Sequence, residues 1–255
     1  MKNFSEITIQ TFKDVLSSKI LYNAVFLGLA IFIITFVSAE FSYGATSRIT
    51  FDIGTGLVSF SICIVSILYG SNLLPTEIDN RTLYMVLSRP VSRGVFISAK
   101  IAGMALVLLL NLMILLSLTL LLFYIFGGKI SWLIFWTFLF VYLEVVILLC
   151  LTVFLSIRVN KVLTILSVLT LWISGHAVEN LKTFSVVNED PFFMKLVTFM
   201  SIYLPNFTKL NLKRFVLNDF SLEGSFFFMN VMYCLLWIFI LVFASKIAFD
   251  KKDLS

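Results

Sequence analysis

The residues best suited to chemistry lie inside apolar stretches of the chain, where titratable groups are rare. Glu144 falls inside a long apolar stretch of the chain. A charged group at the centre of a bilayer costs roughly 2.5–3.5 kcal/mol on insertion scales, so Glu144 is expected to face protein or water, or to be protonated. A substrate contact or a proton-linked switch would use this acid directly. We favour the structural alternative, a hydrogen bond to a neighbouring membrane span.

His176, near the end of another apolar stretch, is the only histidine of the chain. A histidine metal site within one copy is therefore excluded, and we expect His176 to serve in packing or at an interface. Cys63, Cys150 and Cys234 form no C-x-x-C pair, which argues against a zinc or redox site. Since no Ser-His-Asp set or Cys-His pair is positioned at one membrane face, we predict no catalytic residue and no metal ligand.

A dense polar run occupies residues 75–100, between two apolar stretches. It combines the acids Glu77 and Asp79 with four basic residues and a short apolar face that ends at Pro90. We predict a short amphipathic helix at the cytoplasmic surface, followed by a bend. The basic residues alone would fit a positive-inside anchor loop. The acids, the apolar face and the proline favour a surface that docks a partner.

Six apolar stretches must position these residues: 20–39, 53–74, 101–126, 131–157, 161–178 and 226–248. Each is near the ~20 residues that a helix needs to cross a bilayer. Because the stretches are continuous and not alternating, they predict helices and not a barrel. Only 13% of the residues are charged, against about 25% in soluble domains. The composition therefore predicts an all-α integral membrane protein with six transmembrane helices.

The distribution of lysine and arginine predicts the orientation. With the N-terminus in the cytoplasm, inside segments hold twelve of these residues and outside segments hold seven. Five of the seven lie in the long loop 179–225, where the charge bias is a weaker guide. The short loops therefore place both termini in the cytoplasm, and the protein in a bacterial cytoplasmic (inner) membrane.

Two flanking segments are not ordinary loops. Polar and apolar residues interleave at helical spacing over residues 1–19, which favours an interfacial helix over a frayed tail. Within the outer loop, the segment from Pro191 to Pro205 is too apolar for free solvent. We expect short helices there that dip into the outer leaflet or pack on the spans; a seventh span is the alternative. The single domain 1–255 thus divides into 1–19, 20–74, 75–100, 101–178, 179–225 and 226–255.

The polar run resembles a known signature. Its residues are Glu77, then Arg81-Thr82-Leu83, then Leu87-Ser88-Arg89-Pro90-Val91-Ser92-Arg93, then Lys100 and Gly103. This pattern resembles that of ABC-2 type transporter permeases, and most closely the branch that includes the nitrous oxide reductase copper-maturation permeases. The six-span plan, the N-terminal surface helix and the apolar outer loop are also similar. The resemblance therefore covers essentially the whole chain.

The resemblance implies that the 77–93 segment is a coupling helix that docks on a separate ATP-binding cassette ATPase. A second, smaller contact would come from the turn between the fourth and fifth spans. The implied coupling residues are Glu77, Asp79, Arg81, Thr82, Leu83, Leu87, Ser88, Arg89, Pro90, Arg93, Arg158 and Lys161. The chain lacks the G-x-x-x-x-G-K-[ST] phosphate loop, so it is not expected to be an enzyme. ATP and magnesium would be bound by the partner subunit, and this chain would bind no cofactor.

Two spans carry stripes of small polar residues at spacings of three and four. These are Thr55, Ser59 and Ser66 in the second span, where Cys63 falls between Ser59 and Ser66, and Thr164, Ser167, Thr170 and Ser174 in the fifth. The resemblance implies that these spans line a substrate path or a dimer seam. Ordinary close packing of helices is the alternative.

The function expected from these features is that of the permease subunit of an ABC exporter. It would form a homodimer, contact membrane lipids and move a lipid-like or apolar substrate, because Glu144 is the only acidic residue within the spans and the few basic residues lie near the ends of the spans. The alternative is a non-transporting mechanical subunit that passes ATPase strokes to an outer-face protein through residues 179–225. No nucleic-acid partner is expected.

Overall fold

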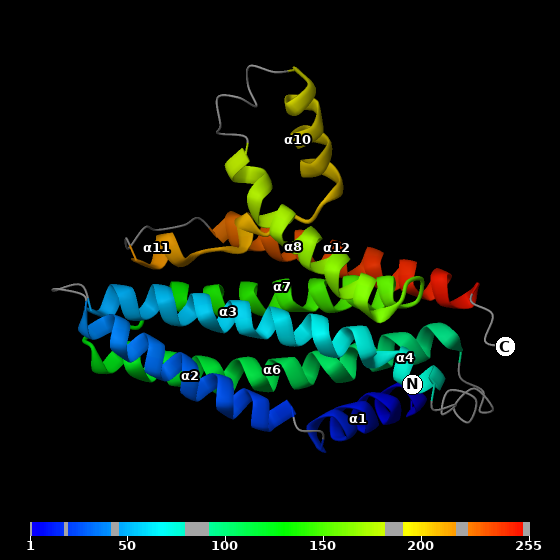
Figure 1. Cartoon of the computed structure of the whole chain (residues 1–255), viewed down its shortest axis with the longest axis horizontal. Coiled ribbons are helices and arrows are strands. Elements are labelled where there is room, and N and C mark those ends of the chain that lie inside the picture. Colours follow the sequence, from blue (N-terminus) through cyan, green and yellow to red (C-terminus); the bar gives the residue numbers. More distant parts are fainter. Residues whose placement is uncertain are drawn as a thin grey trace.

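The computed structural model describes residues 2–17, 20–41, 46–79, 92–181, 191–217 and 224–251, and all regular elements in these ranges are helical (Figure 1). The long helices are α2 (Ile20–Glu40), α3 (Thr46–Leu73), α6 (Arg93–Ile125), α7 (Trp132–Ser156), α8 (Lys161–Leu181) and α12 (Gly224–Asp250). The shorter elements are α1 (Lys2–Ser17), α4 (Pro75–Asp79), α10 (Pro191–Tyr203), the 3-10 turn η1 (Thr208–Leu210) and α11 (Lys213–Leu217).

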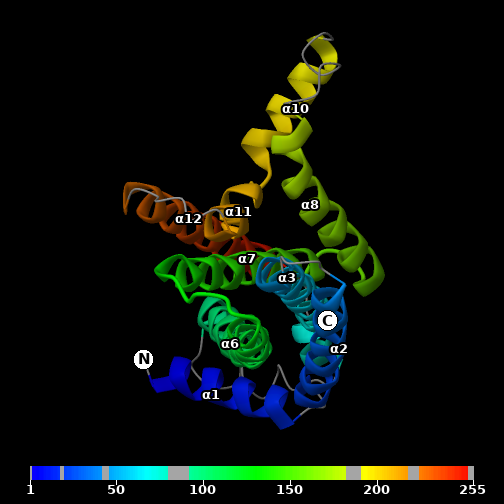
Figure 2. The ribbon, with the colours of Figure 1, turned by 90° about the vertical axis from the view of Figure 1, so that its left-hand side faces the viewer.

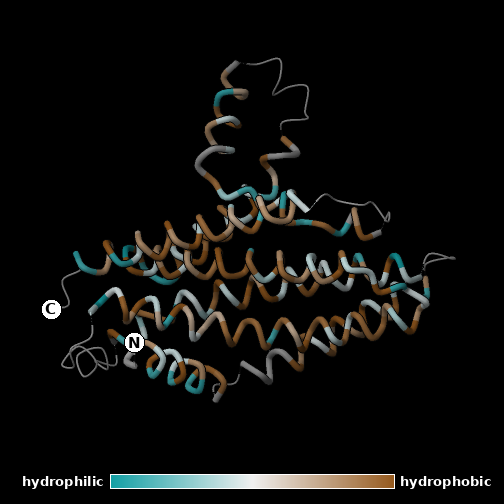
Figure 3. The backbone as a smooth tube through the Cα atoms, turned by 180° about the vertical axis from the view of Figure 1, so that it is seen from behind, coloured by the Kyte–Doolittle hydropathy of each residue, from teal (hydrophilic) through white to brown (hydrophobic). Residues whose placement is uncertain are grey.

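Within the described ranges, five helices are long and apolar enough to cross a membrane. They are Thr46–Ile78, Arg93–Ile125, Trp132–Ser156, Lys161–Val178 and Gly224–Asp250. The predicted first span coincides with α2, a helix of 21 residues, of which Val25–Glu40 forms a shorter apolar helix. Figure 3 shows apolar residues along the bundle helices and polar residues on α1. The all-helical membrane fold is confirmed, and six as the number of spans stays a prediction.

Helix α7 is the central element of the bundle. In its most apolar window 72% of residues are buried, against 22–50% in the other four spans. It packs against α3, α6, α8 and α12, and Phe140, Ile147 and Leu148 on it are fully buried. Because protein surrounds this helix, α7 can carry a buried polar side chain away from lipid.

Helix α1 is held against α6 by a close approach at Gly103. A Cβ atom at this position would lie 2.7 Å from both the Thr11 Cβ and the Thr8 carbonyl oxygen. The Thr8 hydroxyl also donates to the Ala99 carbonyl at 3.4 Å. Figure 2, which views the bundle along its length, shows α1 crossing beside α6. The predicted N-terminal helix is present, and its location at a membrane surface stays a prediction.

The C-terminal part of α8 and helix α10 project from the bundle, and these two helices contact each other (Figures 1 and 2). Helix α10 has 13 residues, which corresponds to about 20 Å of helix. That length is too short for a hydrocarbon core of roughly 30 Å. As described, α10 is therefore not the seventh span that the sequence left as an alternative.

The chain after α10 returns to the bundle. Pro205, Asn206 and Phe207 are buried, as are Leu210 and Leu212. Element η1 contacts both α7 and α8, and α11 contacts α7. We name residues 204–217 the re-entrant segment. The predicted outer loop thus contains one helix beside α8 and one segment folded into the bundle.

Candidate functional site

One end of the bundle gathers α4, the start of α6, the α7–α8 turn and the end of α12 (Figure 1). We call it the charged end. Here the Lys100 ammonium lies 2.5 Å from the Glu77 carboxylate, and their side chains are 10% and 23% exposed. Lys100 also lies over the Phe96 ring, 5.7 Å from its centroid. This partly buried ion pair ties α4 to α6.

Arg93, the first residue of α6, is bonded to the end of α12. Its guanidinium donates to the carbonyls of Phe249 and Asp250, each at 3.3 Å. A cation is favourable there, because the carbonyls at a helix C-terminus carry partial negative charge. The Ser92 hydroxyl caps α6 by accepting from the Val95 amide at 3.4 Å. The chain is therefore fixed on both sides of residues 80–91.

The other predicted coupling residues fall into three groups. Asp79 ends α4. Arg158 and Lys161 are exposed at the α7–α8 turn, with the Arg158 guanidinium 5.0 Å from the centroid of the Phe154 ring. The residues Arg81, Thr82, Leu83, Leu87, Ser88, Arg89 and Pro90 lie outside the described residues.

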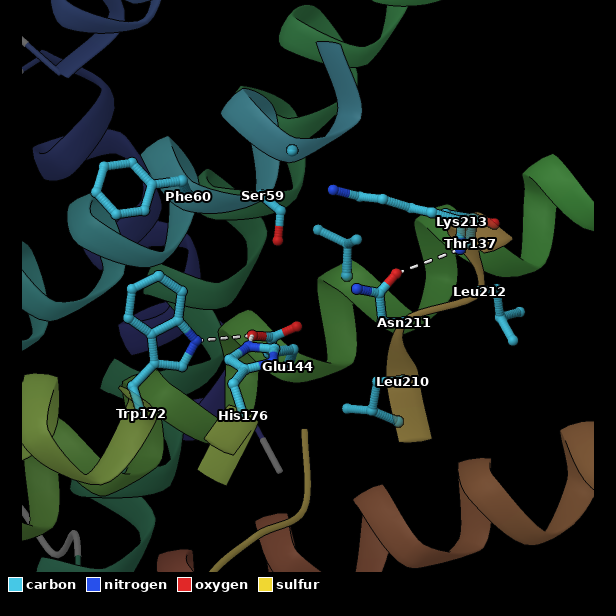
Figure 4. Close-up of a pocket in the computed structure, with 12 residues that line it drawn as sticks. Ser59, Phe60, Thr137, Glu144, Trp172, His176, Leu210, Asn211, Leu212 and Lys213 are labelled. Atoms are coloured by element: carbon cyan, nitrogen blue, oxygen red, sulfur yellow. Dashed lines mark hydrogen bonds and ion pairs between the residues drawn. The ribbon is translucent and has the colours of Figure 1, made fainter. Parts of the chain in front are cut away.

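A second polar cluster lies within the bundle at Glu144, which is only 4% exposed. The indole N–H of Trp172 donates to Glu144 Oε1 at 2.8 Å, and His176 Nε2 lies 2.8 Å from the same oxygen (Figure 4). The Cys63 sulfur lies 4.0 Å from Glu144 Oε1 as well. Trp172 and His176 are one helical turn apart on α8, so both reach one carboxylate. Glu144 thus makes the interhelix hydrogen bonds that its burial requires.

His176 also connects α8 to the residues at the start of η1. Its ring lies 5.7 Å from that of Trp172 and 5.6 Å from that of Phe207, measured between centroids. Its carbonyl accepts from the Thr208 hydroxyl at 3.1 Å. In the part of the chain that the structure describes, no group of three or more His, Cys, Asp or Glu side chains is arranged to hold a metal ion.

A cavity of about 270 Å³ adjoins Glu144. We call it the Glu144 cavity; its wall comes from α3, α7, α8 and residues 210–213 (Figure 4). The Lys213 side chain extends into it and reaches α3, where its Nζ would lie 3.0 Å from a Cβ added at Gly56. Burial lowers the pKa of Lys213 from its ordinary value, while the charges of Asp52 and Glu144 act in the opposite direction.

Sequence reasoning missed the contribution of Asn211 and Lys213, because it assigned residues 179–225 to an outer loop. The only local signal is their alternation with Leu210 and Leu212, both of which are buried. Alternation of this kind indicates a segment with one side in a core. It does not indicate which helices form that core.

The stripe of the second span contacts α7 at Ser66 and near Gly70. The Ser66 hydroxyl donates to the Val145 carbonyl at 3.1 Å, whereas Thr55 bonds within its own helix to Phe51. A Cβ at Gly70 would lie 3.1 Å from Leu149 Cδ1, so α3 and α7 approach closely there. Ser59 differs from these residues, because it lines the Glu144 cavity.

The stripe of the fifth span does not reach this cavity. Thr164 is buried and bonds to the Asn160 carbonyl, and Thr170 is exposed and bonds to that of Leu166. Ser167 and Ser174 are half-buried. Of the seven stripe residues, only Ser59 therefore lines the Glu144 cavity.

These features define a multi-pass helical membrane protein with an ion-paired end and a polar cavity inside its bundle. The chain belongs to the ABC-2 family of transporter proteins, because the family model of that description matches residues 1–254. Members of this family are membrane subunits of ABC transporters and not themselves ATPases, so the family implies a partner ABC ATPase. The resemblance to ABC-2 permeases is confirmed, and the copper-maturation branch stays a prediction. No curated protein compared with the chain matches it.

Proposed function

We propose that this chain is the permease subunit of an ABC exporter and couples to its ATPase through residues 77–93. The observation that carries the proposal is the fixation of this segment at both ends. Glu77 is paired with Lys100 on α6, and Arg93 is bonded to the end of α12. A displacement of the intervening residues by a partner would therefore move α4, α6 and α12 together. Rigid-body motion of this kind is how domain movements are passed between subunits.

The proposed arrangement places six spans, α2, α3, α6, α7, α8 and α12, in a bacterial inner membrane. Both termini lie in the cytoplasm, α1 lies at the cytoplasmic interface, and ATP and magnesium are bound by the partner. The excess of basic residues in the inside segments supports this orientation. Arg158 and Lys161, both exposed, would provide the smaller ATPase contact.

A second copy of the chain would complete the membrane part of the transporter. Helix α8 supports this, since it presents exposed apolar side chains at Val162, Leu166 and Ile173. The proposed substrate is lipid-like or apolar. Its support is the mixed wall of the Glu144 cavity, to which Phe60, Trp172 and Leu212 contribute apolar side chains.

The mechanical alternative rests on α10. Phe193, Met194 and Leu196 are 42–52% exposed on this helix, which projects from the bundle (Figure 1). An exposed apolar patch fits either lipid or a protein partner. In the mechanical alternative, the partner would be an outer-face protein that responds to ATPase strokes.

The test is reconstitution of the full chain with its ATPase. Glu77→Ala and Arg89→Glu are expected to lower ATPase retention and stimulated ATP hydrolysis, because both variants alter charge in the coupling segment. Lys129→Glu, an exposed site outside that segment, is the matched control for the charge change. If both coupling variants retained the ATPase and hydrolysed ATP as the wild type does, residues 77–93 would be an anchor loop and not a coupling segment. Stimulation of hydrolysis by a transported substrate distinguishes the exporter from the mechanical subunit.

A further inference from the structure

The Glu144 cavity contains a carboxylate oxygen that the bundle does not use. The hydrogen bonds to Glu144 from Trp172 and His176 both reach Oε1. Among the described residues, no donor is bonded to Oε2, and Figure 4 shows this oxygen turned away from Trp172. A carboxylate that is 96% buried gains stability from each further donor. A charged donor forms the stronger hydrogen bond with a carboxylate, so the cavity is suited to a ligand that brings an ammonium N–H to Oε2.

The opposite requirement is found at Lys213. Its ammonium enters the same cavity (Figure 4), and no carboxylate of the described ranges lies within the 4.0 Å that defines an ion pair. The charges of Asp52 and Glu144 act on it from farther away. Because burial disfavours an unpaired ammonium, the site is suited to an anionic group on a ligand.

The remaining wall favours a ligand with apolar parts. Phe60 and Trp172 lie 5.8 Å apart between ring centroids, and aromatic faces attract ammonium groups. Phe60 is 52% exposed, so one side of the cavity borders the outer surface of the bundle. A volume of about 270 Å³ is slightly below the roughly 300–1,000 Å³ of sites for drug-sized ligands. This volume suits a polar head group, with acyl chains left outside past Phe60.

We propose that the Glu144 cavity binds a zwitterionic head group with a primary ammonium at Glu144 Oε2 and a phosphate or carboxylate at Lys213 Nζ. A zwitterion complements both charges of the cavity. A net cation would be repelled by Lys213, and a net anion would be repelled by Glu144. Phosphatidylethanolamine and small soluble zwitterions share this chemistry. As a transport substrate such a ligand rests on the proposed exporter function, while its binding does not require the ATPase.

The test measures lipid retention by the purified full chain without ATPase. The chain is incubated in mixed micelles with phosphatidylethanolamine, phosphatidylcholine or phosphatidylglycerol of identical acyl chains, and bound lipid is counted by native mass spectrometry. Phosphatidylethanolamine is expected to be retained about tenfold better than the other two. Phosphatidylcholine has no N–H donor for Oε2, and phosphatidylglycerol has no ammonium.

Two variants locate the binding. Glu144→Gln and Lys213→Met are each expected to lower retention of phosphatidylethanolamine about tenfold. Lys209→Met is the matched control, because Lys209 is exposed and lies over the Tyr233 ring outside the cavity. Displacement of lipid by excess O-phosphoethanolamine would identify a soluble zwitterion as sufficient, and a lack of displacement would assign the site to the lipid.

Equal retention of the three lipids, or no retention, would overturn the proposal. Unchanged retention of phosphatidylethanolamine in either folded variant would do the same. If Glu144→Gln does not fold, the Lys213 variant and the head-group series still decide. Since no ATPase is present, failure here leaves the coupling proposal intact, and failure of coupling leaves this binding result intact.

Discussion

At the scale of single residues, the carboxylates of Glu77 and Glu144 are stabilised in different ways. Glu77 is paired with a lysine at the charged end. Glu144 instead has two hydrogen-bond partners on α8, because the Trp172 indole donates to it and His176 Nε2 lies within hydrogen-bond distance. Inside a bundle a carboxylate without donors is strongly disfavoured, so these hydrogen bonds hold α8 to α7.

The first prediction separates hydrogen bonding from charge at Glu144. Glu144→Gln is expected to keep the stability of the bundle, because an amide oxygen still accepts from Trp172. Glu144→Leu is expected to lower the free energy of unfolding by roughly 1–2 kcal/mol, the scale of hydrogen bonds between spans. Denaturation in micelles, followed by circular dichroism, measures both. Equal destabilisation by the two variants would contradict a hydrogen-bonding role and point to the charge itself.

At the scale of elements, the first turns of α6 connect three neighbours. Arg93 is hydrogen-bonded to α12, Lys100 forms an ion pair with Glu77 of α4, and α1 packs closely against Gly103. These residues lie within about three helical turns, so movement of α6 would be felt by all three partners. The Lys-x-x-Gly pattern at the start of this span therefore has a physical reason, an ion pair followed by a close helix crossing.

The second prediction concerns the crossing of α1 and α6. A methyl group at Gly103 would contact the backbone oxygen of Thr8 at 2.7 Å, so Gly103→Ala must displace α1. Overpacking of this kind typically costs 1–3 kcal/mol. Hydrogen exchange of the α1 amides is expected to accelerate in this variant. Gly224→Ala is the control, since a Cβ there meets no atom within 4 Å; equal effects of the two substitutions would refute the argument.

The third prediction concerns α10. Its exposed apolar side chains would be an aggregation hazard in water, so lipid or a partner is expected to cover them. Protease added from the outside to membrane-embedded protein should therefore cleave slowly after Lys195, which is exposed on this helix. Cleavage as fast as in a detergent-unfolded control would show a solvated helix, and would remove the support for a membrane or partner contact.

At the scale of the whole molecule, the two candidate sites occupy different depths. The charged end gathers helix termini and the ion pair of Glu77 and Lys100. The Glu144 cavity lies near the middle of α7, because Glu144 is the thirteenth of its 25 residues. Helices α3, α6 and α7 run along the bundle from the charged end past the level of Glu144 (Figure 1).

The fourth prediction is the orientation of the molecule. Both termini are expected in the cytoplasm because the short inside segments are rich in lysine and arginine. A reporter fused after Ser255 should be cytoplasmic, and cysteine probes at Thr46 and Asn188 should be labelled from the outside. A cytoplasmic label at Asn188, or an external C-terminus, would reverse this arrangement.

The sequence by itself determined the helical membrane class and the approximate helix bounds. Continuous apolar stretches leave few alternatives in lipid, because every backbone group must be bonded within its own segment. The expected stretch 131–157 and the observed Trp132–Ser156 differ by one residue at each end. Helices α3 and α6 begin seven and eight residues before the expected stretches 53–74 and 101–126, because helices continue into polar residues that hydropathy does not count. The Glu77-to-Gly103 pattern also identified the family, because its order and its position between two spans are local features of the chain.

Only the tertiary structure decided which residues share a site. Trp172 looks like any buried aromatic residue in the sequence, and it becomes the donor to Glu144 because α8 packs on α7 at that level. Lys213 was assigned to an outer loop, and the packing of Leu212 and Phe207 brings it into the bundle. Hydropathy records how apolar each segment is; it does not record which segments become neighbours, and the cavity is made by those neighbours.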